Sequence, residues 1–137
     1  MYGKEKLLYK DLTYKIRGIL FKIHNDLGRF CNEKQYGDAF EQGLTDEGIE
    51  YEREKILHIS FVGEKKGRNR IDFLIEDKII IELKCVSCLG RGDYHQCQRY
   101  LKSSGLDLAL LVNFRPRYLL IRRILNYQKH NKEDGNP

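Results

Sequence analysis

The chain has 137 residues, of which 41% are hydrophobic and 33% are charged, and its formal net charge is +5. This length fits a single domain, and this composition excludes a chain that is disordered throughout. No apolar run approaches the roughly 18 residues of a membrane span, and no apolar signal segment follows Met1. We therefore expect one cytoplasmic domain over residues 1–127, without membrane contact, whose positive charge favours polyanions such as nucleic acid.

The first two elements are predicted to be amphipathic helices. Apolar residues recur at three- and four-residue spacing between Leu12 and Leu27, and Gly28 follows as a stop signal. A second helix is predicted from Asn32, its N-cap, to Asp46. Each helix has one apolar face, so both are expected to cover a common core.

A strand and a β-hairpin are predicted in the middle of the chain. Polar and apolar residues alternate over much of 49–62, which suits a strand with one face on the core. Two further strands, over 68–75 and 78–85, are separated by the short turn EDK. This spacing indicates that the two strands pair as a hairpin.

A helix and two more strands are predicted after the hairpin. The helix covers 94–103 and ends at Gly105. The apolar run LDLALLVNF is typical of a strand covered on both faces, and Asn113 is expected to satisfy backbone groups at its end. RYLLIRRIL forms one further strand, and residues 128–137 are predicted to be a disordered tail.

This order of elements predicts an α/β fold. A helix that links two strands of one sheet is a crossover connection, and strands joined in this way are parallel. The expected sheet is therefore mixed. It contains a three-strand antiparallel meander and a parallel strand after the crossover helix, and helices flank it.

Three charged residues, Asp72, Glu82 and Lys84, stand among the apolar residues of the hairpin. Alternation along a strand places Glu82 and Lys84 on one face. A three-residue turn over 76–78 would place Asp72 opposite Glu82, whereas a two-residue turn would place it opposite Leu83. We predict the three-residue turn, or a bulge near Asp72. The alternative is that these are surface charges on a half-exposed strand.

Two carboxylates placed this closely repel each other unless a cation neutralises them. Ligation by carboxylates, a backbone carbonyl and water suits Mg²⁺ or Mn²⁺. Lys84 on the same face could orient the attacking water and stabilise negative charge on a phosphate. The pattern therefore predicts a metal-dependent site for phosphodiester hydrolysis.

The stretches IDFLI and IIIELK resemble the core motif of the PD-(D/E)XK nuclease superfamily, which implies a restriction-endonuclease-like fold. More narrowly, HNDLGRFCNEKQYGDAF, ELK, QCQRYLKSSGLDLALLVNF and a following RR resemble the GxxExxY family of that superfamily, from about Tyr14 to Leu125. Two positions depart from the pattern. Phe30 stands where the family has glycine, and Ile71 stands where the superfamily has proline.

The resemblance implies a nuclease that hydrolyses phosphodiester bonds of DNA, or of RNA, with Mg²⁺ or Mn²⁺. It implies that Asp72, Glu82 and the backbone carbonyl of Leu83 bind the metal, while Lys84 positions water. A competing hypothesis is a nucleic-acid-binding or protein-interaction module that keeps the same fold with little or no cleavage.

The resemblance also assigns residues on two helices. Glu33 and Tyr36 match the glutamate and tyrosine of the family name, and Glu33 would support the metal or the water. Gln96 and Tyr100 match a Gln-x-x-x-Tyr motif and would hold the scissile phosphate or Lys84. Because they are four residues apart, Gln96 and Tyr100 share one helix face.

Basic residues beside the hairpin are candidate contacts for a phosphate backbone, with solvated charge as the alternative: Lys65, Lys66, Arg68 and Arg70. A second basic group raises the same question at the other end of the sheet: Arg115, Arg117, Arg122 and Arg123.

Cysteines and histidines offer other chemistry. Four cysteines could hold a metal cluster, but their order differs from that of cluster-binding nucleases, and buried or incidental thiols are the favoured interpretation: Cys31, Cys85, Cys88 and Cys97. His24 and His95 could approach the site, although helix-surface or capping roles are more usual.

Overall fold

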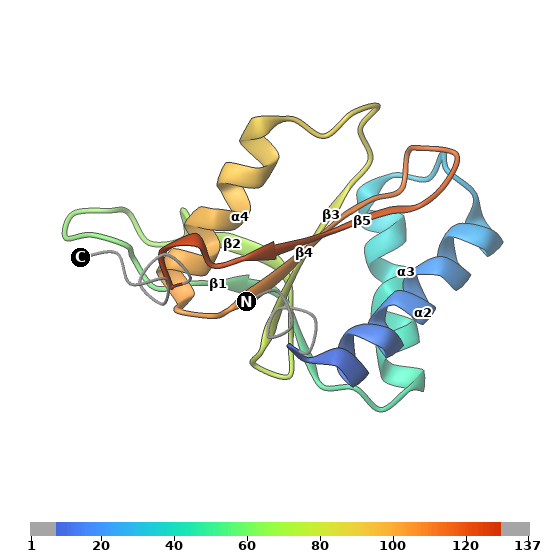
Figure 1. Cartoon of the computed structure of the whole chain (residues 1–137), viewed down its shortest axis with the longest axis horizontal. Coiled ribbons are helices and arrows are strands. Elements are labelled where there is room, and N and C mark those ends of the chain that lie inside the picture. The colour runs from blue at the N-terminus through green and yellow to red at the C-terminus, as the bar shows by residue number, and fades with distance from the viewer. Residues whose placement is uncertain (1–7, 130–137) are drawn as a thin grey trace.

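The computed structural model describes residues 8–129 as one sheet with helices on both faces (Figure 1). Residues 127–129 form a helical turn, and the rest of the predicted tail, 130–137, lies outside the described residues. No helix within residues 8–129 is long and apolar enough to cross a membrane. In chain order the elements are α2 (Lys10–Leu27), α3 (Glu33–Asp46), β1 (Tyr51–Ile56), β2 (Arg70–Ile75), β3 (Ile79–Lys84), α4 (Arg91–Ser104), β4 (Leu108–Asn113) and β5 (Leu120–Leu125).

The five strands form one mixed sheet in the order β1-β2-β3-β4-β5. β1, β2 and β3 form an antiparallel meander, β4 lies parallel to β3, and β5 is antiparallel to β4. Helix α4 connects the two parallel strands, β3 and β4, as the predicted crossover connection requires. The predicted mixed sheet with its crossover helix is therefore confirmed.

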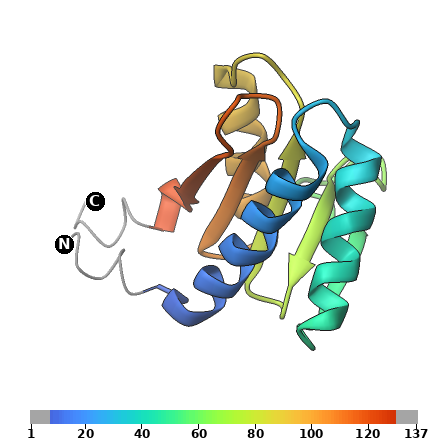
Figure 2. The same cartoon turned by 90° about the vertical axis from the view of Figure 1, so that its right-hand side faces the viewer.

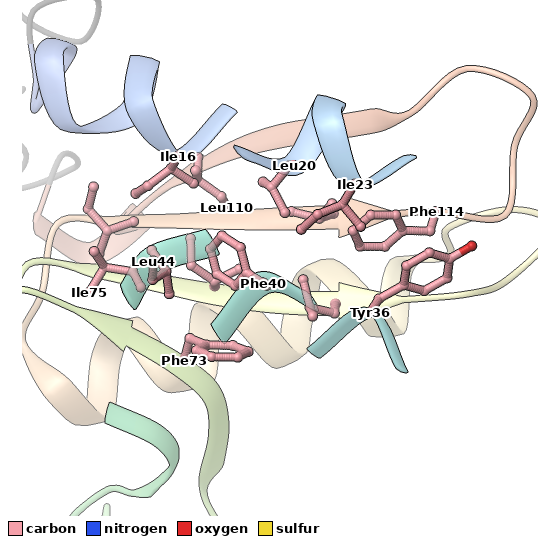
Figure 3. Packing of buried hydrophobic residues seen from close by; sticks show 14 of the residues in the cluster. Ile16, Leu20, Ile23, Tyr36, Phe40, Leu44, Phe73, Ile75, Leu110 and Phe114 are labelled. Carbon is pink, nitrogen blue, oxygen red and sulfur yellow. The ribbon is translucent and has the colours of Figure 1, made fainter. Parts of the chain in front are cut away.

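The sheet separates two hydrophobic cores. Figure 2 shows α2 and α3 in front of the sheet and α4 behind it. On the α2 and α3 side, Phe40 meets the ring of Phe73 edge-on with centroids 4.9 Å apart (Figure 3). On the α4 side, Leu101 packs with Ile80 and Ala109. Because both faces are covered, β3 and β4 consist almost entirely of buried residues.

The helix ends follow local capping rules. Gly28 has φ 77° and donates its N–H to the His24 carbonyl, which ends α2 where a glycine was expected. Asn32 and Gln35 form a capping box that starts α3. Helix α4 begins at residue 91 rather than 94, because the Asp93 carboxylate accepts the Gly90 N–H and caps the helix.

Strand β1 is shorter than the predicted strand over 49–62 and ends at Ile56. The later apolar residues of that segment do not reach a core, since Phe61 is 62% exposed and Val62 is 99% exposed. Instead, the Glu64 carboxylate accepts the Ser60 N–H and helps to close a turn. Alternation alone does not make a strand where no neighbouring strand or core is in reach.

Two helical glycines test how closely α2 and α3 approach. A Cβ added at Gly43 would lie 2.5 Å from Cγ2 of Ile19, whereas one added at Gly18 meets nothing within 4 Å. Gly18→Ala should therefore raise the free energy of unfolding by up to about 1 kcal/mol through helix propensity. Gly43→Ala should be less stable than Gly18→Ala by about 1–3 kcal/mol, because overpacking offsets that gain. Urea denaturation followed by circular dichroism measures both, and equal stabilisation would contradict the close packing.

Candidate active site

The β2–β3 hairpin has the predicted three-residue turn. Ile75 pairs with Ile79, and Phe73 pairs with Ile81, so the turn consists of residues 76–78. Its first two residues adopt left-handed backbone angles, and the Lys78 N–H donates to the Ile75 carbonyl. Continued by one residue, this register sets Asp72 opposite Glu82.

The hairpin ladder ends at Phe73 and Ile81, and the two acidic side chains take over its hydrogen bonds. The backbone N–H of Asp72 donates to Oε2 of Glu82 at 2.7 Å. The backbone N–H of Leu83 donates to Oδ2 of Asp72, also at 2.7 Å. The two carboxylates therefore lie together at the point where the ladder ends, each fixed by an amide of the opposite strand.

Burial makes this pair of charges unfavourable. Glu82 is only 3% exposed, and its burial, followed by the charge of Asp72, raises its pKa to about 8. Burial likewise raises the pKa of Asp72, although the hydrogen bond from Leu83 opposes this shift. A cation shared by both carboxylates would remove the repulsion.

Helix α4 holds Lys84 beside the carboxylates. The Lys84 ammonium donates to Oε1 of Gln96 at 3.0 Å and lies 3.7 Å from Oδ1 of Asp93. Its charge opposes the raised pKa of both Asp72 and Glu82. The amine is therefore oriented from one side by a neutral amide and a carboxylate of the first turns of α4.

Asp93 was missed by the sequence analysis. It caps α4 through Gly90 and also faces Lys84. The sequence did carry a signal for it: Asp93 stands three residues before Gln96, and residues three or four apart share a helix face.

Tyr100 lies deeper on the same side of the sheet. It is 5% exposed, and its burial, followed by the charge of Glu82, raises its pKa to about 12. The phenol therefore stays protonated at neutral pH and can act as a hydrogen-bond donor. Gln96 and Tyr100, the predicted Gln-x-x-x-Tyr pair, therefore both lie on α4, the helix that covers this face of the sheet.

Glu33 approaches the carboxylates from the other side of the sheet. It is the first residue of α3 and lines a cavity of about 200 Å³ with Asp72, Gly37 and Glu54. Its charge raises the pKa of both Asp72 and Glu82. Glu54, which the sequence analysis did not single out, has φ 53° and also raises the pKa of Asp72.

The first basic group lies close to the site along the chain. Arg70 begins β2, two residues before Asp72, and its guanidinium lies 3.5 Å from Oε1 of Glu54. The others stand in the connection before β2, where all three side chains are exposed: Lys65, Lys66 and Arg68. Along the chain, this group precedes the end of β2 that carries Asp72.

The second basic group needs a correction. Lys84 pairs with Asn113 in parallel β3 and β4, so both strands reach the same end of the sheet. Arg115 and Arg117 follow directly and therefore lie at the end that carries Lys84, not at the other end. Asn113 ties this end together as expected, since its amide binds both the N–H and the carbonyl of Val86.

The cysteines do not gather into a cluster. All four are free thiols; Cys97 is buried behind the sheet, whereas Cys31 and Cys85 pack on the side of α2 and α3. Across residues 8–129, no three His, Cys, Asp or Glu side chains are placed to hold a metal ion. The Nε2 of His24 donates to the carbonyls of Phe114 and Pro116, in the connection between β4 and β5.

Comparisons with known proteins agree with this architecture. A model of the PD-(D/E)XK nuclease superfamily matches residues 10–124. The solved structure of an alkaline exonuclease from Laribacter hongkongensis aligns with a TM-score of 0.53 at 15% sequence identity. The alignment covers 73% of this chain and 58% of that one, and at this identity it shows a shared fold. A comparison with curated proteins finds no match.

The buried charge pair generates a stability prediction. Glu82→Gln keeps an oxygen that can accept the Asp72 N–H but removes a charge. It should stabilise the metal-free protein by about 1–3 kcal/mol at pH 8. Because folding raises the pKa of Glu82 from 4.5 to about 8, wild-type stability is lost as the pH rises through this range. The difference in stability between Glu82→Gln and the wild type should therefore nearly vanish at pH 4.

Urea denaturation in EDTA at both pH values measures this difference. Glu47→Gln, at an exposed position after α3, is the matched control and should change stability by less than about 0.5 kcal/mol. A Glu82→Gln variant that is less stable than the wild type at pH 8 would show that the charge pair is not a source of strain.

Proposed function

The chain belongs to the PD-(D/E)XK nuclease superfamily, and from this we propose that it is a metal-dependent nuclease that hydrolyses phosphodiester bonds, of DNA in preference to RNA. The observation that carries the proposal is the crossed hydrogen bonding of Asp72 and Glu82, with Lys84 held beside them. We include membership of the GxxExxY group in the proposal, on the strength of Glu33 and Tyr36 in its motif.

The donor atoms of the site fit Mg²⁺ or Mn²⁺. Asp72, Glu82 and the carbonyl of Leu83 would hold the ion, and water would complete its coordination, because hard cations of this kind accept few protein ligands. Burial, followed by neighbouring negative charge, raises the pKa of both acids, and a bound cation would lower these pKa values. When bound, the metal supplies charge that polarises a phosphate oxygen and makes water a better nucleophile.

Lys84 would act directly on the substrate. Its ammonium can donate hydrogen bonds to the attacking water and to a non-bridging phosphate oxygen, where negative charge builds up during hydrolysis. Gln96 and Asp93 hold this ammonium in place, so they serve as positioning residues. Preorganised donors are effective because they need no reorientation during the reaction.

Glu33 and Tyr100 would complete the site from opposite sides of the sheet. Glu33 is exposed and shares the cavity with Asp72, so it can hold water or support the metal. Tyr100 keeps its proton and can donate a hydrogen bond to the scissile phosphate. The backbone of the nucleic acid would lie along the basic connection before β2, formed by Lys65, Lys66 and Arg68 with Arg70.

Cleavage of labelled DNA and RNA tests the proposal. The wild type should cleave in Mg²⁺ or Mn²⁺ and not in EDTA. Lys84→Ala and Glu82→Gln should each lower the rate by at least about 100-fold, because each removes a group that acts at the reacting phosphate. Lys78→Ala, an exposed lysine of the same hairpin, is the matched control and should keep full activity.

The outcomes separate the two functional hypotheses. Cleavage that survives both Lys84→Ala and Glu82→Gln would point to a contaminating nuclease and reject the site. If the wild-type protein binds nucleic acid but cleaves none in Mg²⁺ or Mn²⁺, the competing hypothesis of a non-catalytic nucleic-acid-binding module is supported.

Gln96 offers a second prediction, on positioning. Gln96→Ala should lower the maximal rate by roughly 10- to 100-fold, because Lys84 loses its orienting acceptor. It should keep the rise in melting temperature that Mg²⁺ gives the wild type, since the metal ligands are unchanged. Gln42→Ala, on the exposed face of α3, is the control. A Gln96→Ala variant that loses the Mg²⁺ response would place Gln96 at the metal rather than at Lys84.

A further inference from the structure

Two loops meet at the end of the sheet that carries Lys84. One connects α2 to α3, and the other connects β4 to β5; both Figure 1 and Figure 2 show them side by side. Nε of Arg29 donates to the carbonyl of Arg115 at 2.6 Å, and Nε of Arg115 donates to the carbonyl of Arg29 at 3.2 Å. This reciprocal pair of bonds joins the two loops into one surface.

Exposed aromatic rings lie on this surface with arginines against them. Phe30 is 76% exposed, and the guanidinium carbons of Arg29 and Arg115 lie 4.8 and 5.8 Å from its ring centroid. Tyr118 is also 76% exposed, with Arg117 5.5 Å from its centroid. We call these five residues the aromatic–arginine surface. Rings this exposed contribute little to the core, so folding does not explain them.

Buried side chains hold both loops from below. The Tyr36 hydroxyl donates to the Gly28 carbonyl and accepts the Cys31 N–H, while its ring stacks on Phe114 at 4.0 Å. His24 donates to the carbonyl of the same Phe114. The exposed rings therefore stand on backbone that is already ordered, which lowers the entropy cost of binding a partner.

The surface is electropositive. Within residues 8–129, none of Arg29, Arg115 and Arg117 forms an ion pair with a carboxylate, whereas Arg53 pairs with both Asp38 and Glu41. Uncompensated guanidinium groups beside exposed rings suit a ligand that combines negative charge with planar groups.

The surface adjoins the end of the sheet that carries Lys84. The Phe114 N–H donates to the carbonyl of Lys84 at 2.9 Å. The loop that carries Arg115 and Tyr118 therefore leaves the sheet beside the last residue of β3, which is Lys84.

We propose that the aromatic–arginine surface binds single-stranded nucleic acid, with unpaired bases stacked on Phe30 and Tyr118 and phosphates on the arginines. Bases offer free faces only where they are unstacked, so a duplex cannot use the rings in this way. The proposal rests on the proposed function for its nucleic-acid ligand, and it narrows the substrate to a single strand, or an unpaired end, of DNA or RNA.

Fluorescence anisotropy in EDTA tests this without cleavage. The probes are a labelled 20-nucleotide DNA strand, its RNA counterpart and the DNA duplex. The double variant Phe30→Ala, Tyr118→Ala should bind both single strands at least about tenfold more weakly, whereas its duplex affinity should change less than about threefold. Arg117→Gln should lower the salt dependence of single-strand binding by about 0.7 in log–log slope.

The outer face of α2 supplies matched controls. Tyr14 is 79% exposed and lies about 20 Å from the end of the helix. Tyr14→Ala and Arg17→Gln should leave binding unchanged.

Three results would each overturn the proposal. The double variant could weaken duplex and single-strand binding equally, it could leave single-strand binding unchanged, or the wild type could bind no nucleic acid. The last result would favour a protein partner. Single-strand binding that depends on the rings, in a protein that does not cleave, would reject only the nuclease proposal.

Discussion

The burial of Asp72 beside Glu82 is the constraint on which the site depends. Where the hairpin ladder ends, the backbone amides of Asp72 and Leu83 still need acceptors, and the two carboxylates supply them. Neutral side chains could meet the same need without mutual repulsion. The raised pKa values therefore mark a pair that is poorly suited to stability alone, and perturbed acids in such a setting are characteristic of sites that bind a cation or carry out chemistry.

The topology of the sheet gathers the other groups around this pair. Because β3 and β4 are parallel, their carboxyl ends meet, and the chain leaves both strands at the same place. Helix α4 starts above this end and brings Asp93 and Gln96 to Lys84. Helix α3 starts on the opposite face and brings Glu33. Ligand sites at the carboxyl ends of parallel strands are a general property of α/β sheets, so the arrangement follows from one crossover connection.

Local rules predicted the features that depend on neighbouring residues: the stop at Gly28, the cap at Asn32 and the three-residue turn that sets the register of Asp72. Features that depend on distant residues were missed. The alternation after Ile56 indicated a strand, but no core lies beneath it. Asp93 was not singled out, because its contact with Lys84 comes from another element. The position of Arg115 was misjudged, although it follows from the predicted parallel strands.

The buried polar side chains near the site explain how a small domain keeps that end ordered. Tyr36, His24 and Asn113 each form two or more hydrogen bonds to loop backbone. A buried polar group costs free energy unless its bonds are made, so each of these side chains stabilises one loop conformation over others. The tyrosine of the GxxExxY pattern is then a structural residue, while its glutamate faces the carboxylates. Phe30, which stands where that pattern has glycine, lies on the loop that Tyr36 holds, so the same buried tyrosine fixes the backbone beneath the exposed ring.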